Sequence, residues 1–227
     1  MRGCFVTGTD TGVGKTVVAA AMVAALSQRG LAVAPLKPVL TGLDEPDPER
    51  PADHELLAAA TGGQRAAESI VSVTFGPAVS PHLAAELAGA RVDPAMLVAD
   101  ARNAAGGADL VVAEGAGGLL VPITGGYLMR DYALDLELPV VIAARPGLGT
   151  INHSLLTVES ARGAGLRVLG VVLTPWPQEP DAMLRSNRET IERLGGVEVA
   201  ALAQTGIAAA QLAAAGETLP LERWLGV

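Results

Sequence analysis

The chain has 227 residues, of which 50% are hydrophobic and 18% charged, and its formal net charge is −8. This composition excludes a disordered chain and leaves enough apolar residues for a sizeable core. The acidic balance, without any Lys/Arg cluster, argues against nucleic acid or an anionic membrane as a partner. No secretory signal and no long apolar run is visible, and the single cysteine fits a reducing compartment. We therefore expect a cytoplasmic protein, folded as a single domain over residues 1–227.

Short apolar runs alternate with longer helical segments along the chain. The predicted strands are Cys4–Thr7, Val33–Pro38, Leu110–Glu114, Val140–Ala144, Val168–Leu173 and Val197–Leu202. The predicted helices are Lys15–Gln28, Asp53–Ala60, Pro81–Leu87, Pro94–Ala104, Leu128–Leu136, Ile151–Ala164 and Asp181–Leu194. Apolar strands separated by helices are typical of an α/β fold, with a mainly parallel sheet of about seven strands and helices on both faces.

The first predicted strand runs directly into the segment Gly8 to Thr16, which ends in the Gly-Lys-Thr of a Walker A motif. Glycines let backbone N–H groups surround phosphate oxygens, and the following helix adds the positive end of its dipole. Lys15 would reach the outer phosphates, while the Thr16 hydroxyl can bind magnesium. The spacing departs from the usual pattern, because Thr9 occupies the first-glycine position. The motif predicts a nucleotide site and a P-loop NTPase-like fold.

Only two of the 16 basic residues are lysines, Lys15 and Lys37. Lys37 ends the second predicted strand, and Pro38 favours an extended backbone at that point. A lone lysine is usually a solvated surface charge, so that alternative stays open. The apolar flanking residues, and the use of arginine everywhere else, favour a site that needs a compact ammonium group.

Two carboxylates are candidates for a magnesium site. Glu114 ends an apolar strand and precedes Gly115 to Gly118, which is the Walker B arrangement for binding or orienting a metal ion. The glycines also allow a ligand to approach the backbone closely. Asp53 begins a predicted helix, where it is either an N-cap or a second carboxylate for a hard cation.

These segments together resemble the dethiobiotin synthetase family, from the N-terminus to about Pro177. The segments that match are Phe5–Thr16, Lys37–Val39 with Thr41 and Gly42, Glu114–Gly118, and Leu148–His153. The resemblance implies that a homodimer uses ATP and magnesium to convert 7,8-diaminopelargonate and carbon dioxide (or bicarbonate) to dethiobiotin. An amine of the substrate would form a carbamate, which attacks the γ-phosphate. The second amine would then close the ring from a carbamic–phosphoric anhydride.

The resemblance also implies a role for individual residues. Lys37 and Lys15 would be catalytic, and Thr16, Asp53 and Glu114 would bind magnesium. The nucleotide would be bound by Gly12, Val13, Gly14, Lys15, Thr16, Val17, Asp53, Glu114, Gly115, Ala116, Gly117, Thr174 and Pro175. The substrate would be bound by Thr11, Thr41, Leu148 and Asn152, the last two across the dimer interface. Some family members carry Asn in place of Thr174, and a single hydroxyl offers fewer contacts to a base than an amide does.

Two other classes of P-loop protein are alternatives. A ParA/MinD-like ATPase switch would carry an extra lysine early in the loop, where this chain has Asp10. It would also need a basic surface or tail, and the C-terminal residues 219–227 lack one. An amide-forming ligase of the same superfamily would need a glutaminase domain, for which the chain is too short.

Overall fold

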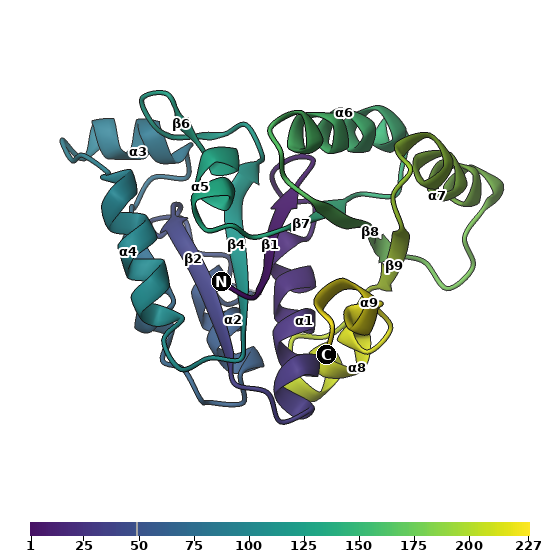
Figure 1. Cartoon of the computed structure of the whole chain (residues 1–227), viewed down its shortest axis with the longest axis horizontal. Helices are drawn as coiled ribbons and strands as arrows, with labels where there is room; N and C mark the ends of the chain where they lie inside the picture. The colour runs from purple at the N-terminus through teal and green to yellow at the C-terminus, as the bar shows by residue number, and fades with distance from the viewer. Residues whose placement is uncertain (49) are drawn as a thin grey trace.

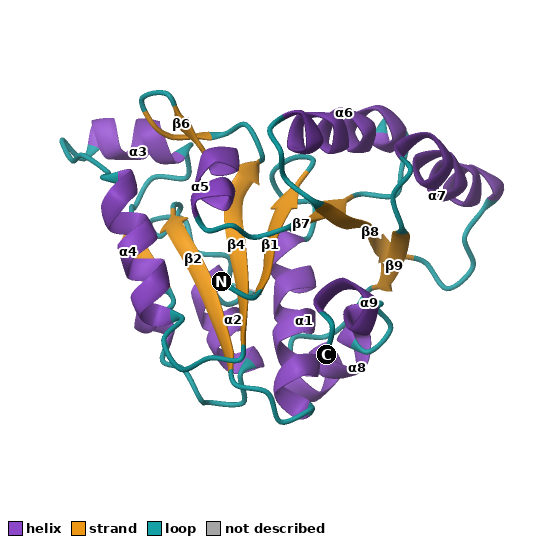
Figure 2. Cartoon of the chain, viewed as in Figure 1, coloured by secondary structure: helices purple, strands orange, loops and turns teal. Residues whose placement is uncertain are grey.

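The computed structural model describes residues 1–48 and 50–227, and a twisted sheet runs through its centre (Figures 1 and 2). In these residues the sheet has seven strands in the order β3-β2-β4-β1-β7-β8-β9, and every neighbouring pair is parallel. The α/β P-loop fold and its parallel sheet are thereby confirmed. The strands are β1 Gly3–Gly8, β2 Val33–Leu40, β3 Val71–Thr74, β4 Leu110–Gly118, β7 Val140–Ala144, β8 Val168–Trp176 and β9 Val199–Ala203.

Helices cover both faces of the sheet. One face carries α1 Lys15–Gln28, α2 Asp53–Ala60, α8 Ala209–Gly216 and α9 Leu221–Leu225, whose apolar residues share one core cluster. The other face carries α3 Pro81–Leu87, α4 Pro94–Ala104, α5 Met129–Asp135, α6 Thr150–Gly163 and α7 Ala182–Gly195, around a second cluster. Short strands β5 Pro122–Thr124 and β6 Tyr127–Leu128 form a separate antiparallel pair, and η1 Ala67–Ser69 is a single 3₁₀ turn.

The ends of several predicted elements differ from the structure. Strand β4 continues past Glu114 to Gly118, and β8 continues past Leu173 to Trp176. The last strand begins two residues later than predicted, at Val199. Glycine and proline weaken strand propensity, so the sequence pattern placed the ends of β4 and β8 too early. The edge strand β3 was not predicted, because its four residues are only partly buried and show no apolar run.

The C-terminal helices pack against the helix that follows the phosphate loop, and Figure 1 shows α8 beside α1. A Cβ atom at Gly216 of α8 would overlap the carbonyl oxygen of Ala21 in α1, so a glycine is needed for this close approach. Trp224 of α9 fills the space above Gly170 of β8 in the same way. The sequence did not predict these two helices, whose role is to cover the α1 face of the sheet.

Strand β1 lies at the position where the chain changes direction across the sheet. It pairs with β4 on one side and with β7 on the other, and the strands that follow extend outward in both directions. In open parallel sheets the crevice beyond the carboxyl end of such a strand binds ligands. The loop after β1, which is the predicted phosphate loop, occupies this crevice.

Candidate active site

The loop between β1 and α1 has the backbone conformation of a phosphate loop. Gly12 and Gly14 have φ angles of 69° and 94°, in the left-handed region that favours glycine. The backbone N–H of Thr11 donates to the Asp10 carboxylate at 2.7 Å. The Lys15 ammonium is buried and donates to the Asp10 carbonyl oxygen at 2.9 Å, so it folds back over the loop. The loop therefore surrounds a space at the N-terminus of α1 with N–H groups and one cation.

Four side chains from four separate elements meet beside this loop. Nζ of Lys37 in β2 lies 2.6 Å from Oδ2 of Asp53 and 2.8 Å from Oε1 of Glu114. The Thr16 hydroxyl lies 2.9 Å from an oxygen of each of the same two carboxylates. We call Thr16, Lys37, Asp53 and Glu114 the cation cluster. Lys37 and Glu114 lie within the neighbouring strands β2 and β4, Thr16 lies in the first turn of α1, and Asp53 reaches them from the start of α2.

Lys37 and Asp53 favour each other's charged forms in a buried setting, whereas burial raises the pKa of Glu114. Burial opposes the charge of Lys37, but Glu114 and Asp53 hold its pKa above the ordinary value. Burial likewise opposes ionisation of Asp53, but Lys37 holds the pKa of this carboxyl below its ordinary value. Lys15 has a lowered pKa, first because it is buried and also because Lys37 repels its charge. Lys15 and Lys37 thus repel each other beside the phosphate loop, and an anionic ligand bound there would relieve that repulsion.

The oxygen atoms of the cation cluster fit a magnesium ion. Oε2 of Glu114 is buried and has no hydrogen-bond partner within the described residues. Thr16, Asp53 and Glu114 supply hydroxyl and carboxylate oxygens, the ligands that magnesium prefers. No group of three or more His, Cys, Asp or Glu residues suited to a metal is found among residues 1–48 and 50–227. Magnesium commonly binds to proteins through only one or two carboxylates together with phosphate and water, so the pair here is sufficient.

Two further contacts bring other predicted site residues to the phosphate loop. A Cβ atom on Gly14 would lie 2.7 Å from Cγ2 of Thr174, so the buried end of β8 touches the loop. Pro175, next along β8, is exposed beside it. A Cβ atom on Gly117 would lie 3.6 Å from the Thr11 hydroxyl, so the glycine segment after Glu114 borders the loop from the other side.

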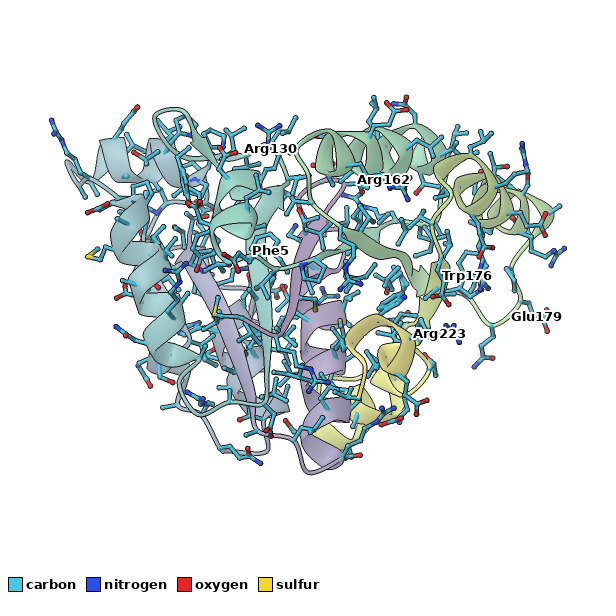
Figure 3. All side chains as sticks on the ribbon, in the orientation of Figure 1. Phe5, Arg130, Arg162, Trp176, Glu179 and Arg223 are labelled. Carbon is cyan, nitrogen blue, oxygen red and sulfur yellow. The ribbon has the colours of Figure 1, made fainter. Side chains whose placement is uncertain are left out.

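The remaining predicted residues differ in how deeply they are buried. Val13 is buried behind the phosphate loop, Val17 is half-buried in the first turn of α1, and Thr41 follows the last residue of β2. Gly115 packs against Phe5, which lies at the middle of the sheet (Figure 3), and Ala116 is half-buried beside it.

The loop from β7 to α6 carries the two residues expected to reach the substrate. Leu148 is 94% exposed and Asn152 is exposed in the first turns of α6. Neither contacts the cation cluster through a hydrogen bond within the described residues. Asn187 of α7 anchors the loop by donating to the carbonyl oxygen of Pro146 at 3.0 Å.

Sequence reasoning missed one charged residue at this edge. Arg145 follows directly after β7, and its guanidinium donates to the Thr11 carbonyl oxygen at 3.1 Å. This bond joins the β7–α6 loop to the phosphate loop. The rule that found Lys37 and Glu114, which looks for charged residues at the carboxyl ends of strands, also applies to Arg145.

Comparison with known proteins identifies the family. A family model described as an AAA domain matches residues 2–204. The ATP-dependent dethiobiotin synthetase of Anaeromyxobacter dehalogenans strain 2CP-1 is 46% identical over 194 residues, covering 86% of each chain. The corresponding protein of Bacillus subtilis strain 168 is 37% identical over 88% of this chain and 85% of its own. The chain belongs to the dethiobiotin synthetase family.

Solved structures of other families share the fold of this dethiobiotin synthetase family member. The cell division ATPase MinD of Pyrococcus furiosus superposes with a TM-score of 0.54, covering 96% of this chain and 98% of that one, at 17% sequence identity. At that identity the likeness concerns the fold alone. The much higher identity to dethiobiotin synthetases favours the family predicted from the motifs over the ParA/MinD-like alternative. Over residues 1–48 and 50–227, none of the helices has the length and apolar character needed to span a membrane.

Proposed function

We propose that the chain is an ATP- and magnesium-dependent dethiobiotin synthetase, which carboxylates 7,8-diaminopelargonate and closes the product ring. The observation that carries this proposal is the buried Lys37 ammonium, held between Asp53 and Glu114 beside the phosphate loop. Its relatives at 37% to 46% identity, all ATP-dependent dethiobiotin synthetases, support the same activity.

The phosphate loop would hold the triphosphate of ATP. Backbone N–H groups of the loop and the Lys15 ammonium meet the phosphate oxygens. Lys15 would exchange its bond to the Asp10 carbonyl for the outer phosphates, whose negative charge favours the protonated ammonium. The other residues of the nucleotide site would be Gly12, Val13, Gly14, Thr16, Val17, Gly115, Ala116 and Gly117, with Thr174 and Pro175 toward the base.

Thr16, Asp53 and Glu114 would hold magnesium. The ion would neutralise phosphate charge during transfer of the phosphoryl group. Oε2 of Glu114 has no hydrogen-bond partner in residues 1–48 and 50–227, so it can accept a metal ion. Asp53 would stay ionised because its pKa is lowered by Lys37.

Lys37 would reduce the repulsion between the two anionic reactants, which are the carbamate and the γ-phosphate of ATP. A carbamate oxygen attacks the γ-phosphorus, the bond to the bridging oxygen breaks, and ADP leaves. Both reactants are negative and repel each other, and an ammonium fixed by Asp53 and Glu114 lowers that repulsion without reorganising. The second amine then attacks the carbonyl carbon of the carbamic–phosphoric anhydride, phosphate leaves with the bonding electrons, and the amine loses a proton as the ring closes.

Substrate binding would involve two protomers. Thr11 and Thr41 would donate hydrogen bonds to the carbamate from either side of Lys37. Leu148 and Asn152 are exposed and form no hydrogen bond with the cation cluster among the described residues, which suits residues that reach the substrate of a partner in a homodimer. Sedimentation of the full chain at micromolar concentration would give twice the 23.0 kDa monomer mass, whereas a monomer would contradict this arrangement.

Residues 1–227 would form a single P-loop α/β domain, since α8 and α9 pack on α1 rather than forming a core of their own. Use of ATP and a single buried cysteine, Cys4, suit a cytoplasmic location.

The experiment is an assay of phosphate release with diaminopelargonate and bicarbonate, each omitted in turn, with ATP, CTP and GTP compared. The proposal requires that phosphate release depends on the diamine and that a product with the mass of dethiobiotin forms. Phosphate release at the same rate without the diamine would contradict it. Glu114→Gln should raise the magnesium concentration needed for half-maximal activity about tenfold or more, whereas the exposed Glu159→Gln should leave it unchanged.

A further inference from the structure

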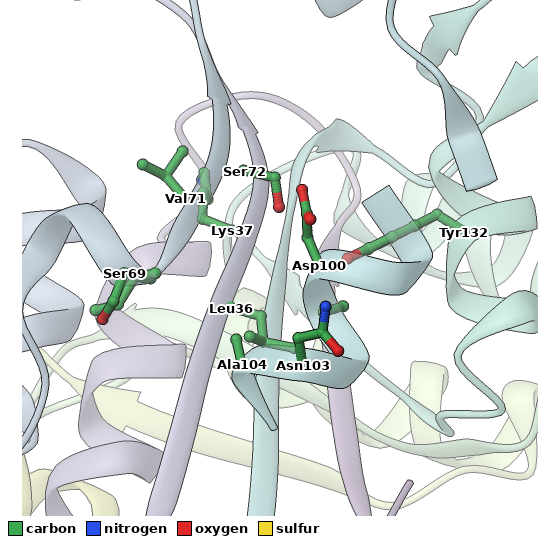
Figure 4. Close-up of a pocket in the computed structure, with 11 residues that line it drawn as sticks. Leu36, Lys37, Ser69, Val71, Ser72, Asp100, Asn103, Ala104 and Tyr132 are labelled. Carbon is green, nitrogen blue, oxygen red and sulfur yellow. The ribbon is translucent and has the colours of Figure 1, made fainter. Parts of the chain in front are cut away.

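A second polar cavity lies on the other face of β2 from the cation cluster (Figure 4). It has a volume of about 300 Å³ and is enclosed by β2, β3, α4 and the side chain of Tyr132 from α5. Successive side chains of a strand point to opposite faces. Accordingly, Leu36 belongs to the core on this side, whereas the Lys37 ammonium is held on the other side by Asp53 and Glu114. The cavity is therefore separate from the proposed active site.

The Tyr132 hydroxyl is the buried polar group of this cavity. The side chain is fully buried, and its hydroxyl has no hydrogen-bond partner in residues 1–48 and 50–227. Its ring is fixed edge-on against Phe5, with centroids 6.1 Å apart and planes at 69°. A buried hydroxyl without a partner is unfavourable, and native proteins normally satisfy it with protein, water or a ligand. Packing thus holds an unsatisfied polar atom at the wall of the cavity.

Of the other polar side chains in the lining, apart from Lys37, Ser69 donates its hydroxyl to the carbonyl oxygen of Ala66, which leaves Ser72, Asp100 and Asn103. In the described part of the chain none of the three forms a side-chain hydrogen bond or ion pair. Burial, and next the charge of Asp100, raise the pKa of Tyr132. Figure 4 shows Asp100 and Ser72 near one another and Tyr132 reaching in beside them.

The chemistry of this lining selects a cation with several hydrogen-bond donors. The carboxylate, the amide oxygen and the two hydroxyl oxygens are all acceptors. Lys37 also borders the cavity, but its Nζ is engaged by Asp53 and Glu114. The described lining therefore offers one uncompensated negative charge. Asn103 is exposed, so a ligand has a route from solvent.

We propose that this cavity is a binding site for a small primary ammonium compound, whose three N–H donors would meet Asp100, Tyr132 and Asn103 or Ser72. Charge-assisted hydrogen bonds are the strongest of these contacts, so Asp100 is the main determinant. The volume lies at the lower end of the range for small-molecule sites and suits an ammonium on a short carbon chain. This site goes beyond the proposed function, because it lies on the opposite face of the sheet from the phosphate loop.

The test is a titration of the full chain with n-propylammonium chloride, followed by two-dimensional amide NMR. We expect saturable shifts at Ser72 and Asn103, and no saturable shifts with n-propanol, which has the same shape without the charge. Asp100→Asn should weaken binding about tenfold or more. The matched control Glu159→Gln removes an exposed carboxylate from α6 and should change the affinity less than about twofold.

A second variant keeps the test decisive if Asp100→Asn folds poorly. Tyr132→Phe removes only the unpaired hydroxyl, so it should weaken n-propylammonium binding while the free protein melts at the same or a higher temperature. Absence of shifts at the cavity would mean that it holds water only and would overturn the proposal. Equal binding of n-propanol, or shifts confined to Thr11 and Lys15, would overturn it as well. No diaminopelargonate is present, so this result is independent of the dethiobiotin synthetase proposal.

Discussion

Two polar clusters flank β2, and they differ in whether their charges are paired. On one face, Lys37 lies between Asp53 and Glu114 with both ion pairs at 2.8 Å or less. On the other face, Asp100 and the buried Tyr132 hydroxyl have no hydrogen-bond partner in the described chain. The ion pairs hold the side chains of the paired cluster in fixed positions, whereas the unpaired cluster has polar groups that can still bond to a ligand. The difference predicts opposite responses to removal of a polar group.

The largest effect should come from Lys37→Met, which removes the cation from the paired cluster. Glu114 is fully buried, so an uncompensated carboxylate would remain there. We expect the free energy of unfolding to fall by about 3 kcal/mol or more, and kcat to fall about 100-fold or more. Urea unfolding and phosphate release measure the two effects. Lys37→Arg should recover most of the stability, because the charge persists. If Lys37→Met is as stable as the wild type, the folded state tolerates the two carboxylates without this cation.

The phosphate loop beside the paired cluster should tolerate no side chain at Gly14. Alanine there would be strained at φ 94° and would lie 2.7 Å from Cγ2 of Thr174. We expect Gly14→Ala to cost about 2 kcal/mol of stability and to weaken ATP binding. The matched control is Gly30→Ala, which has φ 84° but no atom within 4 Å of the new Cβ. Equal losses in the two variants would show that backbone strain alone matters and that the contact with Thr174 does not.

The paired cluster should also make stability depend on pH. Lys37 holds the pKa of Asp53 below its ordinary value despite burial, so ionised Asp53 stabilises the folded state at neutral pH. This contribution should be lost as the pH falls below about 4, through the lowered pKa of the folded state. The difference in unfolding free energy between wild type and Asp53→Asn should therefore shrink between pH 7 and pH 3. A difference that grows toward low pH would contradict the assigned direction.

The smallest effect should come from Tyr132→Phe in the unpaired cluster. Its change in stability should have the opposite sign to that of Lys37→Met. Removing a buried hydroxyl without a partner should stabilise the protein, by about 1 kcal/mol or less. Tyr127 serves as the matched control, because its hydroxyl donates to Asp135 at 2.7 Å. Tyr127→Phe should therefore destabilise slightly, and thermal unfolding would compare both. Loss of stability in Tyr132→Phe would mean that the hydroxyl has a partner in solution.

The sequence predicted the paired cluster well and the unpaired cluster not at all. In the sequence pattern, Lys37 and Glu114 lie at the ends of apolar runs and the phosphate loop follows another, and the carboxyl ends of parallel strands share one edge of the sheet. In the structure both residues lie within their strands, β2 and β4. Asp53 remained ambiguous in the sequence, because the first residue of a helix can serve as a cap as well as a ligand. In the structure the N-cap of α2 is Ala52, and Asp53 faces Lys37 and Thr16.

The cavity could not be predicted, because Ser72, Asp100 and Tyr132 come from β3, α4 and α5 without any shared motif. Their proximity depends on how the helices pack, which sequence spacing does not report. The same reason explains why α8 and α9 were missed. Five of the eight residues 209–216 are alanine, and α8 is positioned by contact with α1 rather than by its own apolar pattern.

The central claim is that Lys37 serves the reaction of a dethiobiotin synthetase rather than the fold alone. The most direct measurement is the rate of phosphate release by Lys37→Arg at saturating ATP, magnesium, bicarbonate and diaminopelargonate, together with its affinity for ATP. We expect unchanged ATP affinity and a kcat lower by about tenfold or more, because a planar guanidinium cannot replace a compact ammonium. Arg193→Lys, at an exposed position on α7, should leave both quantities unchanged. Diamine-dependent turnover of Lys37→Arg at the wild-type rate would contradict the claim.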